Sequence, residues 1–125
     1  MSLILESGAL IAPERDDRSM WARLKAARLS GQLPRTHGGV VDQVWRGLPR
    51  QARLARSLAG IEVVPLDEAL GHSAGALLAR TGGADAIDAA VACLAGDGDS
   101  IVTSDPGELR TLAAASGRHV EVIAV

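Results

Sequence analysis

Apolar runs alternate with helical patterns along the whole chain. Four runs are short and nearly continuous, which is typical of buried strands: Ser2–Leu5, Ile61–Leu66, Ser100–Thr103 and Val120–Val125. A weaker strand is predicted over Gln32–Thr36, where Pro34 favours an edge position. Strands that alternate with helices predict a parallel sheet covered by helices on both faces. The expected fold class is therefore α/β, with three layers and a parallel sheet of four to five strands.

Helical spacing of apolar residues fills the segments between these strands. Residues 17–30 form an amphipathic pattern that places Met20 and Trp21 in the core, and Gly31 ends it. Asp67 is expected to cap a helix that runs from Glu68 to about Arg80. Further helices are predicted over residues 9–12, 40–46, 50–58, 85–95 and 106–115.

The stretch from Asp85 to Asp105 joins a helix, a tight turn and a strand. The helix is apolar nearly all round, which indicates burial, yet Asp85 and Asp88 lie on one side of its first turn. Asp105 follows the strand Ser100–Thr103, at the carboxyl end where open α/β sheets bind ligands. Glu6 follows the first strand in the same way.

These acids have a purely structural alternative, because acids commonly cap helices. Asp105-Pro106-Gly107-Glu108 is such a capping pattern, and Asp85 with Asp88 fits the same device. Capping does not require convergence, however, whereas the strand ends and helix starts that face one crevice all carry acids. The candidate acids are Glu6, Asp42, Asp85, Asp88 and Asp105.

Converging carboxylates repel one another, and their pKa values rise unless a cation neutralises them. Mg²⁺ or Mn²⁺ is the natural cation for an all-oxygen site. Such an ion activates water and stabilises the leaving oxygen in phosphodiester hydrolysis. The acids therefore predict a magnesium or manganese site, which could support chemistry of this kind.

Composition narrows the picture. A chain of 125 residues with 47% apolar content is expected to form one domain, residues 1–125. The net charge of −2 gives no general attraction to nucleic acid or membrane, and 2% aromatic residues argue against base-stacking platforms. Cys93 is the only cysteine and is read as a small core residue, which suits the reducing cytoplasm. No signal peptide and no membrane span are expected.

Four motifs in order resemble the PIN-domain family, and within it the VapC-type toxins of bacterial toxin–antitoxin pairs. They are Leu-Glu-Ser-Gly-Ala-Leu-Ile-Ala (5–12), Val-Trp-Arg-Gly (44–47), Asp-Ala-Ile-Asp-Ala-Ala-Val-Ala (85–92) and Val-Thr-Ser-Asp-Pro (102–106). The resemblance spans nearly the whole chain. It implies a Mg²⁺-dependent endoribonuclease with RNA as substrate, a cognate antitoxin as partner and a homodimeric state.

The resemblance also assigns the site. Its four acid positions correspond to Glu6, Gln43, Asp85 and Asp105, with Asp88 nearby and Ser7 at a hydroxyl position. Glu6, Asp85 and Asp105 are then the expected metal ligands, and Asp88 is catalytic with them. Two positions depart from the family pattern: the first acid is normally Asp, and the second is normally Glu. Asp42 adjoins Gln43, but neighbours on a helix point roughly 100° apart, so it is a poor substitute.

Other residues have simpler interpretations beside the functional one. Arg46, Arg50, Arg53 and Arg56 recur at helical spacing and could contact an RNA backbone, although a solvated face is the favoured explanation. The three histidines are far apart and are expected at the surface or at partner contacts. Trp45 is expected to anchor the core or an interface.

Three hypotheses follow. The first is a PIN-domain endoribonuclease that acts as the toxin of a type II toxin–antitoxin system. The second is a degenerate PIN domain that lacks efficient metal binding, as Glu6 and Gln43 suggest, and serves as a protein- or RNA-binding module. The third is a flavodoxin-like regulatory domain with acids around Mg²⁺.

Overall fold

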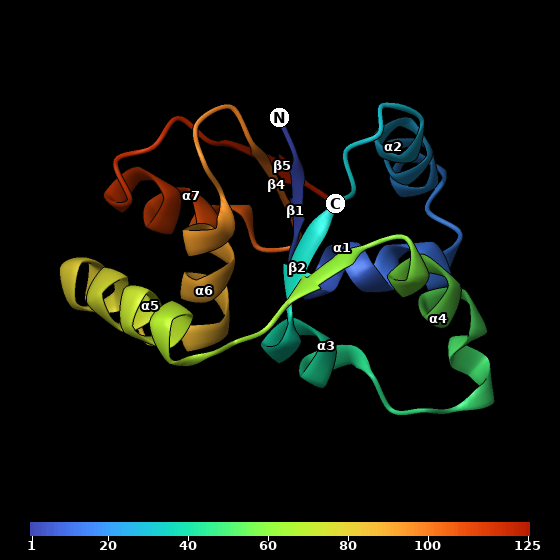
Figure 1. Cartoon of the computed structure of the whole chain (residues 1–125), viewed down its shortest axis with the longest axis horizontal. Helices are drawn as coiled ribbons and strands as arrows, with labels where there is room; N and C mark the ends of the chain where they lie inside the picture. Colours follow the sequence, from blue (N-terminus) through green and yellow to red (C-terminus); the bar gives the residue numbers. More distant parts are fainter.

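The computed structural model describes residues 1–125, and five parallel strands lie at its centre (Figure 1). Their order in the sheet is β3-β2-β1-β4-β5. The strands are β1 (Leu3–Leu5), β2 (Arg35–His37), β3 (Glu62–Val64), β4 (Ser100–Thr103) and β5 (Glu121–Ala124). The predicted α/β class with an all-parallel sheet is confirmed, and the β4 bounds coincide with the predicted strand.

Seven α-helices surround this sheet. They are α1 (Ser7–Ile11), α2 (Arg18–Leu29), α3 (Gly38–Val44), α4 (Ala52–Ala59), α5 (Glu68–Thr81), α6 (Ala86–Leu94) and α7 (Pro106–Ala115). Short 3-10 helices cover Ala12–Arg15 and Pro49–Gln51. Figure 1 shows α5, α6 and α7 on one side of the sheet, and α1, α2 and α4 on the other, which gives the expected three layers.

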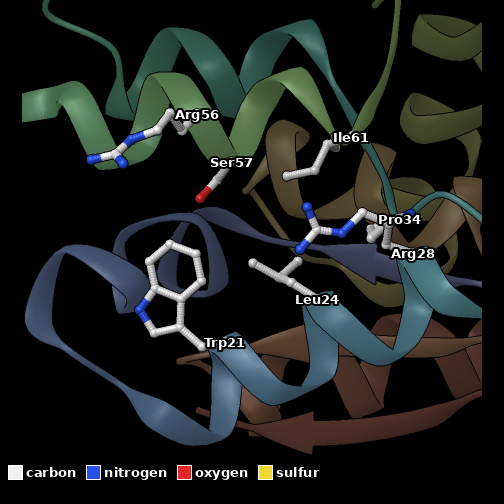
Figure 2. A pocket seen from close by; sticks show the side chains of 8 residues that line it. Trp21, Leu24, Arg28, Pro34, Arg56, Ser57 and Ile61 are labelled. Atoms are coloured by element: carbon white, nitrogen blue, oxygen red, sulfur yellow. The ribbon is translucent and has the colours of Figure 1, made fainter.

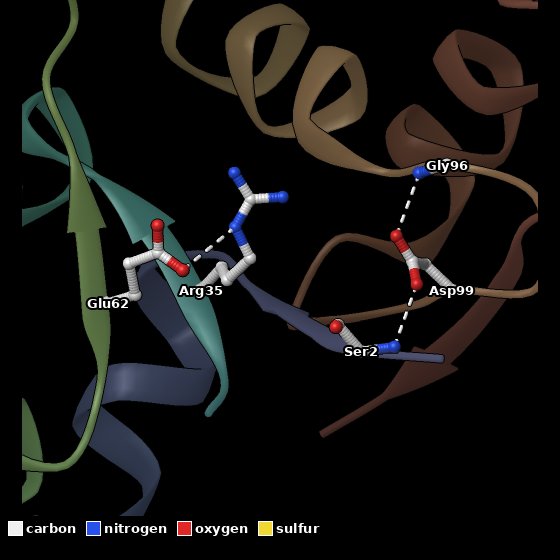
Figure 3. Close-up of polar contacts among 5 residues, drawn as sticks. All are labelled: Ser2, Arg35, Glu62, Gly96 and Asp99. Atoms are coloured by element: carbon white, nitrogen blue, oxygen red, sulfur yellow. Dashed lines mark hydrogen bonds and ion pairs between the residues drawn. The ribbon is translucent and has the colours of Figure 1, made fainter. Parts of the chain in front are cut away.

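The edge position predicted for the second strand is wrong, because β2 lies between β1 and β3. Pro34 precedes the strand, and its carbonyl accepts a 2.8 Å hydrogen bond from the backbone N–H of Glu62. The proline therefore contributes an acceptor at a point where no N–H is needed. Arg35 and Glu62 also pair at 3.4 Å across β2 and β3 (Figure 3).

The core is built on the two central strands. Ile4, Leu5, Ile101 and Val102 are fully buried on β1 and β4. The α6 segment Ala89–Ala92 is buried against them, so the predicted buried helix is confirmed. The small alanine side chains let this helix pack closely.

At the amino ends of the strands, the Asp99 carboxylate accepts hydrogen bonds from the backbone N–H groups of Ser2 (2.7 Å) and Gly96 (2.8 Å) (Figure 3).

Two aromatic residues lie outside the core. Met20 is fully buried as predicted, but Trp21 is 39% exposed, and Trp45 is 40% exposed rather than a core anchor. Met20 is the only buried residue of α2, because this helix contacts the molecule along a narrow stripe. The periodicity of apolar residues predicted a wider contact stripe on this helix than the structure has. No helix in the structure combines the length and apolarity needed to cross a membrane.

Candidate functional site

The strand order reverses direction at the centre of the sheet, between β1 and β4. The chain places β2 and β3 on one side of β1, and β4 and β5 on the other. Connections that leave in opposite directions open a crevice beyond the carboxyl ends of the two central strands, the usual ligand position in such sheets. Glu6 follows β1 and Asp105 follows β4, so both lie at the carboxyl ends of these two strands. The first turn of α6, which Asp85 caps, reaches the same edge.

The Glu6 carboxylate is fully engaged within the protein. One oxygen accepts hydrogen bonds from the Ser7 hydroxyl and from the backbone N–H of Gly8 (3.1 Å). The other accepts from the Thr103 hydroxyl (2.5 Å) and the backbone N–H of Ser104 (3.2 Å). Glu6 is only 5% exposed. It therefore caps α1 and, at the same time, ties the end of β1 to the end of β4.

These contacts decide the charge of Glu6. Burial alone would raise its pKa, but the hydrogen bonds from Ser7, Thr103, Gly8 and Ser104 outweigh it and hold the pKa below the ordinary value. A carboxylate has about four lone-pair sites, and all are used here. The extra methylene of Glu6 thus does not project the charge outward. Instead, the side chain turns inward and places the carboxylate among donors from the protein.

The start of α1 lies unusually close to the end of β4. A Cβ on Gly8 would stand 2.5 Å from the Ser104 Cβ and 2.9 Å from its backbone nitrogen. Only glycine leaves room for this approach. The contact brings the Gly8 and Ser104 N–H groups to the two oxygens of one carboxylate.

We therefore expect Gly8→Ala to lower the free energy of unfolding by about 1–3 kcal/mol through overpacking. Gly107→Ala is the matched control, because Gly107 is also the second residue of its helix and a Cβ there meets nothing within 4 Å. Denaturant unfolding of both variants measures the difference. Equal stability of the two would contradict the close approach.

Asp85 and Asp105 cap their helices, as the capping alternative predicts. The Asp85 carboxylate accepts a 2.9 Å hydrogen bond from the backbone N–H of Asp88, and the Asp105 carboxylate accepts one of 3.3 Å from that of Glu108. Each bond uses one oxygen, and the structure assigns no protein donor to the second. Capping and ligand binding are therefore compatible in these two residues.

Asp88 is the acid at the middle of the group. It is only 8% exposed, and no hydrogen bond from the protein reaches its carboxylate. Burial raises its pKa most, and the charges of Asp85, Glu6, Glu108 and Asp105 raise it further, to about 7. The structure thus brings three of the predicted acids, Glu6, Asp85 and Asp105, together with Glu108 around the fourth, Asp88, whose carboxylate has no hydrogen-bond donor from the protein.

No family model matches this chain, and no curated protein matches its sequence.

The second predicted acid position does not join this group. Asp42 and Gln43 are exposed on α3, and Asp42 is not among the charges that raise the Asp88 pKa. Ser7 lies where the resemblance puts a hydroxyl, and it donates its hydrogen to Glu6. Arg46 and Arg50 are exposed, as expected for a solvated face, and Arg53 pairs instead with Asp16.

Sequence reasoning missed Glu108 and Thr103 as site residues. Glu108 is three residues after the capping Asp105, which marked it only as a helix-start residue. The backbone N–H of Asp105, which a capping box would give to Glu108, donates instead to the Thr103 hydroxyl at 2.9 Å. Glu108 is thereby released to add its charge at Asp88. The signal available in the sequence was the polar Thr103 at the end of a buried strand.

The group fits a hydrated divalent cation better than a tightly ligated one. No three acid, histidine or cysteine side chains are close enough together to hold an ion directly. Mg²⁺, however, usually takes one or two carboxylates and keeps several waters. The Asp88 carboxylate has no protein partner and is surrounded by negative charge, so it is the ligand whose charge repulsion a bound cation would reduce most.

A separate groove of about 230 Å³ lies between α2 and α4 (Figure 2). Trp21 and Leu24 line one wall, and Arg56 and Ser57 line the other. The Ser57 hydroxyl is buried without a hydrogen-bond partner. No acid lines this groove, so it is distinct from the acidic group at the strand ends.

Proposed function

We propose that this chain is a metal-dependent endoribonuclease of the PIN type that acts as the toxin of a toxin–antitoxin pair. The supporting observation is Asp88, a buried acid with no protein donor and a pKa of about 7 among four other acids at the carboxyl ends of the central strands. The proposals of an RNA substrate, a cognate antitoxin and a homodimer rest on the motif resemblance alone.

Asp85, Asp88 and Asp105 would surround a hydrated cation, with at most two of them binding it directly and the others binding its waters, and Glu108 would add negative charge. Bound Mg²⁺ or Mn²⁺ would supply an activated water and charge neutralisation at the phosphate. The protein groups have defined tasks. Thr103 accepts from the backbone N–H of Asp105 and donates to Glu6, so it fixes the direction of Asp105. The capping bond from Asp88 to Asp85 fixes the two acids of α6 relative to each other.

Asp105→Asn tests this proposal with little structural disturbance. Asparagine keeps the oxygen that caps α7, and it is as good a capping residue as aspartate. We expect RNA cleavage to fall by more than about 100-fold, since even outer-shell groups of metal sites contribute about 10–100-fold. The measurement is cleavage of a structured RNA pool by antitoxin-free protein with Mn²⁺, with Mg²⁺ and with chelator.

Asp67→Asn is the matched control, because Asp67 caps α5 in the same way without belonging to the acidic group. It should cleave as the unmodified chain does. Unchanged cleavage by a clean preparation of Asp105→Asn would contradict the assignment.

The binding-module hypothesis also has an observation in its favour. Glu6 uses both carboxylate oxygens within the protein, so it offers no free lone pair to a cation. If the site is degenerate, the unmodified chain should cleave no RNA, and Glu6→Asp with Gln43→Glu should create activity. Cleavage by the unmodified chain that chelator abolishes would exclude this second candidate.

A further inference from the structure

His37 is a buried histidine, whereas the sequence predicted a position at the surface or at a partner contact. Its side chain is fully buried at the carboxyl end of β2. Nδ1 is 3.0 Å from the backbone nitrogen of Gly39, and Nε2 is 2.9 Å from the carbonyl oxygen of Ile87. A backbone N–H can only donate and a carbonyl can only accept, so Nδ1 accepts and Nε2–H donates. The two partners thus fix one neutral tautomer.

The Ile87 carbonyl, which accepts the second of these bonds, lies on the turn that carries two of the acids. Ile87 lies between Asp85 and Asp88 in the first turn of α6. Gly39, at the start of α3, packs closely against the same two residues. A Cβ at this position would stand only 2.7 Å from the Ile87 Cδ1 and 2.9 Å from the His37 Cε1. The start of α3, the end of β2 and the first turn of α6 therefore meet at one imidazole.

We propose that His37 is a positioning residue, which holds the first turn of α6 so that Asp85 and Asp88 face the acids of the strand ends. Its role in a reaction rests on the proposed function, whereas its control of this turn does not. The imidazole is suited to the task because its acceptor and its donor lie on opposite sides of one rigid ring. Burial lowers the pKa of His37, although the bond to Ile87 partly opposes this shift. The lowered pKa favours the neutral ring, the form in which Nδ1 can accept from Gly39.

Two substitutions separate the two bonds. The Asn oxygen takes the place of Nδ1, so His37→Asn keeps the acceptor for Gly39 and loses the donor to Ile87. The Gln amide reaches the place of Nε2, so His37→Gln keeps the donor to Ile87 and loses the cap of α3. A residue that serves only as core filler would respond alike to both changes.

The first readout is amide hydrogen exchange without added metal. We expect the Asp88 and Ala89 amides, which are bonded to Asp85, to exchange about tenfold faster in His37→Asn and near the unmodified rate in His37→Gln. The Glu108 and Leu109 amides, bonded to Asp105 in the matching turn of α7, are the internal control. Equal exchange of the α6 turn in both variants would overturn the proposal.

The second readout is the Mn²⁺ concentration that gives half of the metal-induced thermal shift. We expect it to rise about tenfold in His37→Asn, at the low end for outer-shell groups, and to stay within about twofold in His37→Gln. If the unmodified chain shows no shift with Mn²⁺, the proposed function fails, and amide exchange still decides the role of His37. Nitrogen NMR of the unmodified imidazole needs no variant: a proton on Nδ1 instead of Nε2 would overturn the argument.

Discussion

Asp88→Asn is expected to stabilise the metal-free protein at pH 8 while leaving it nearly unchanged at pH 4. The folded state raises the Asp88 pKa from 3.8 to about 7. The proton on Asp88 therefore supports the fold fully below pH 3.8, and this support is lost as the pH rises through 7. Each pKa unit is worth about 1.4 kcal/mol, so asparagine should restore on the order of 2–4 kcal/mol at pH 8. Denaturant unfolding at the two pH values measures it.

Asp42→Asn is the control for this substitution, because Asp42 is exposed and does not act on Asp88. It should leave stability unchanged at both pH values. Added Mn²⁺ should stabilise the unmodified chain at pH 8 and should have a much smaller effect on Asp88→Asn. Equal stability of Asp88→Asn and the unmodified chain at pH 8 would show that the acids do not converge on this residue.

Glu6→Gln is expected to have the opposite effect, lowering the free energy of unfolding by about 2–4 kcal/mol at pH 7. Each Glu6 oxygen receives one hydroxyl and one backbone N–H. The hydroxyls can turn to accept from an amide group, but the N–H groups of Gly8 and Ser104 cannot. Whichever way glutamine is oriented, one backbone N–H faces another donor.

The pH dependence of this loss has a defined sign. The folded state lowers the Glu6 pKa, so its carboxylate supports the fold above pH 4.5 and loses this contribution as the pH falls through the lowered value. The gap between the unmodified chain and Glu6→Gln should therefore narrow in acid. Glu62→Gln, at an exposed ion pair with Arg35, should change stability by less than about 1 kcal/mol. A similar small effect at Glu6 would contradict the four contacts.

Much of the fold and the convergence of the acids could be predicted from local patterns. Continuous apolar runs identified strands such as Ser100–Thr103, and the all-round apolarity of residues 86–94 indicated a buried helix. Acids after the first and fourth strands then had to share one edge, because all strands of the sheet are parallel. The strand order was not readable, because no local signal says which strands are neighbours.

The details of the site depend on contacts between distant residues. Glu6 turns inward because Thr103, at the end of β4, and Ser104, which follows it, supply donors. His37 is buried because Gly39 and the Ile87 carbonyl satisfy both ring nitrogens, whereas isolated histidines are usually exposed. In each case the position of the side chain depends on a hydrogen-bond partner whose location cannot be predicted from the sequence pattern.

The pairing of β1 with β4 also has a consequence for how the chain acquires its fold. Leu3 is in register with Ser100, and Glu6 accepts from Thr103 across a sequence separation of 97 residues. Such contacts close a long loop and are typical of slow steps in folding. During synthesis, β1 emerges long before its central neighbour exists. The acidic group around Asp88 therefore assembles only after β4 has left the ribosome, so a partly synthesised chain lacks the site that we propose to be destructive to RNA.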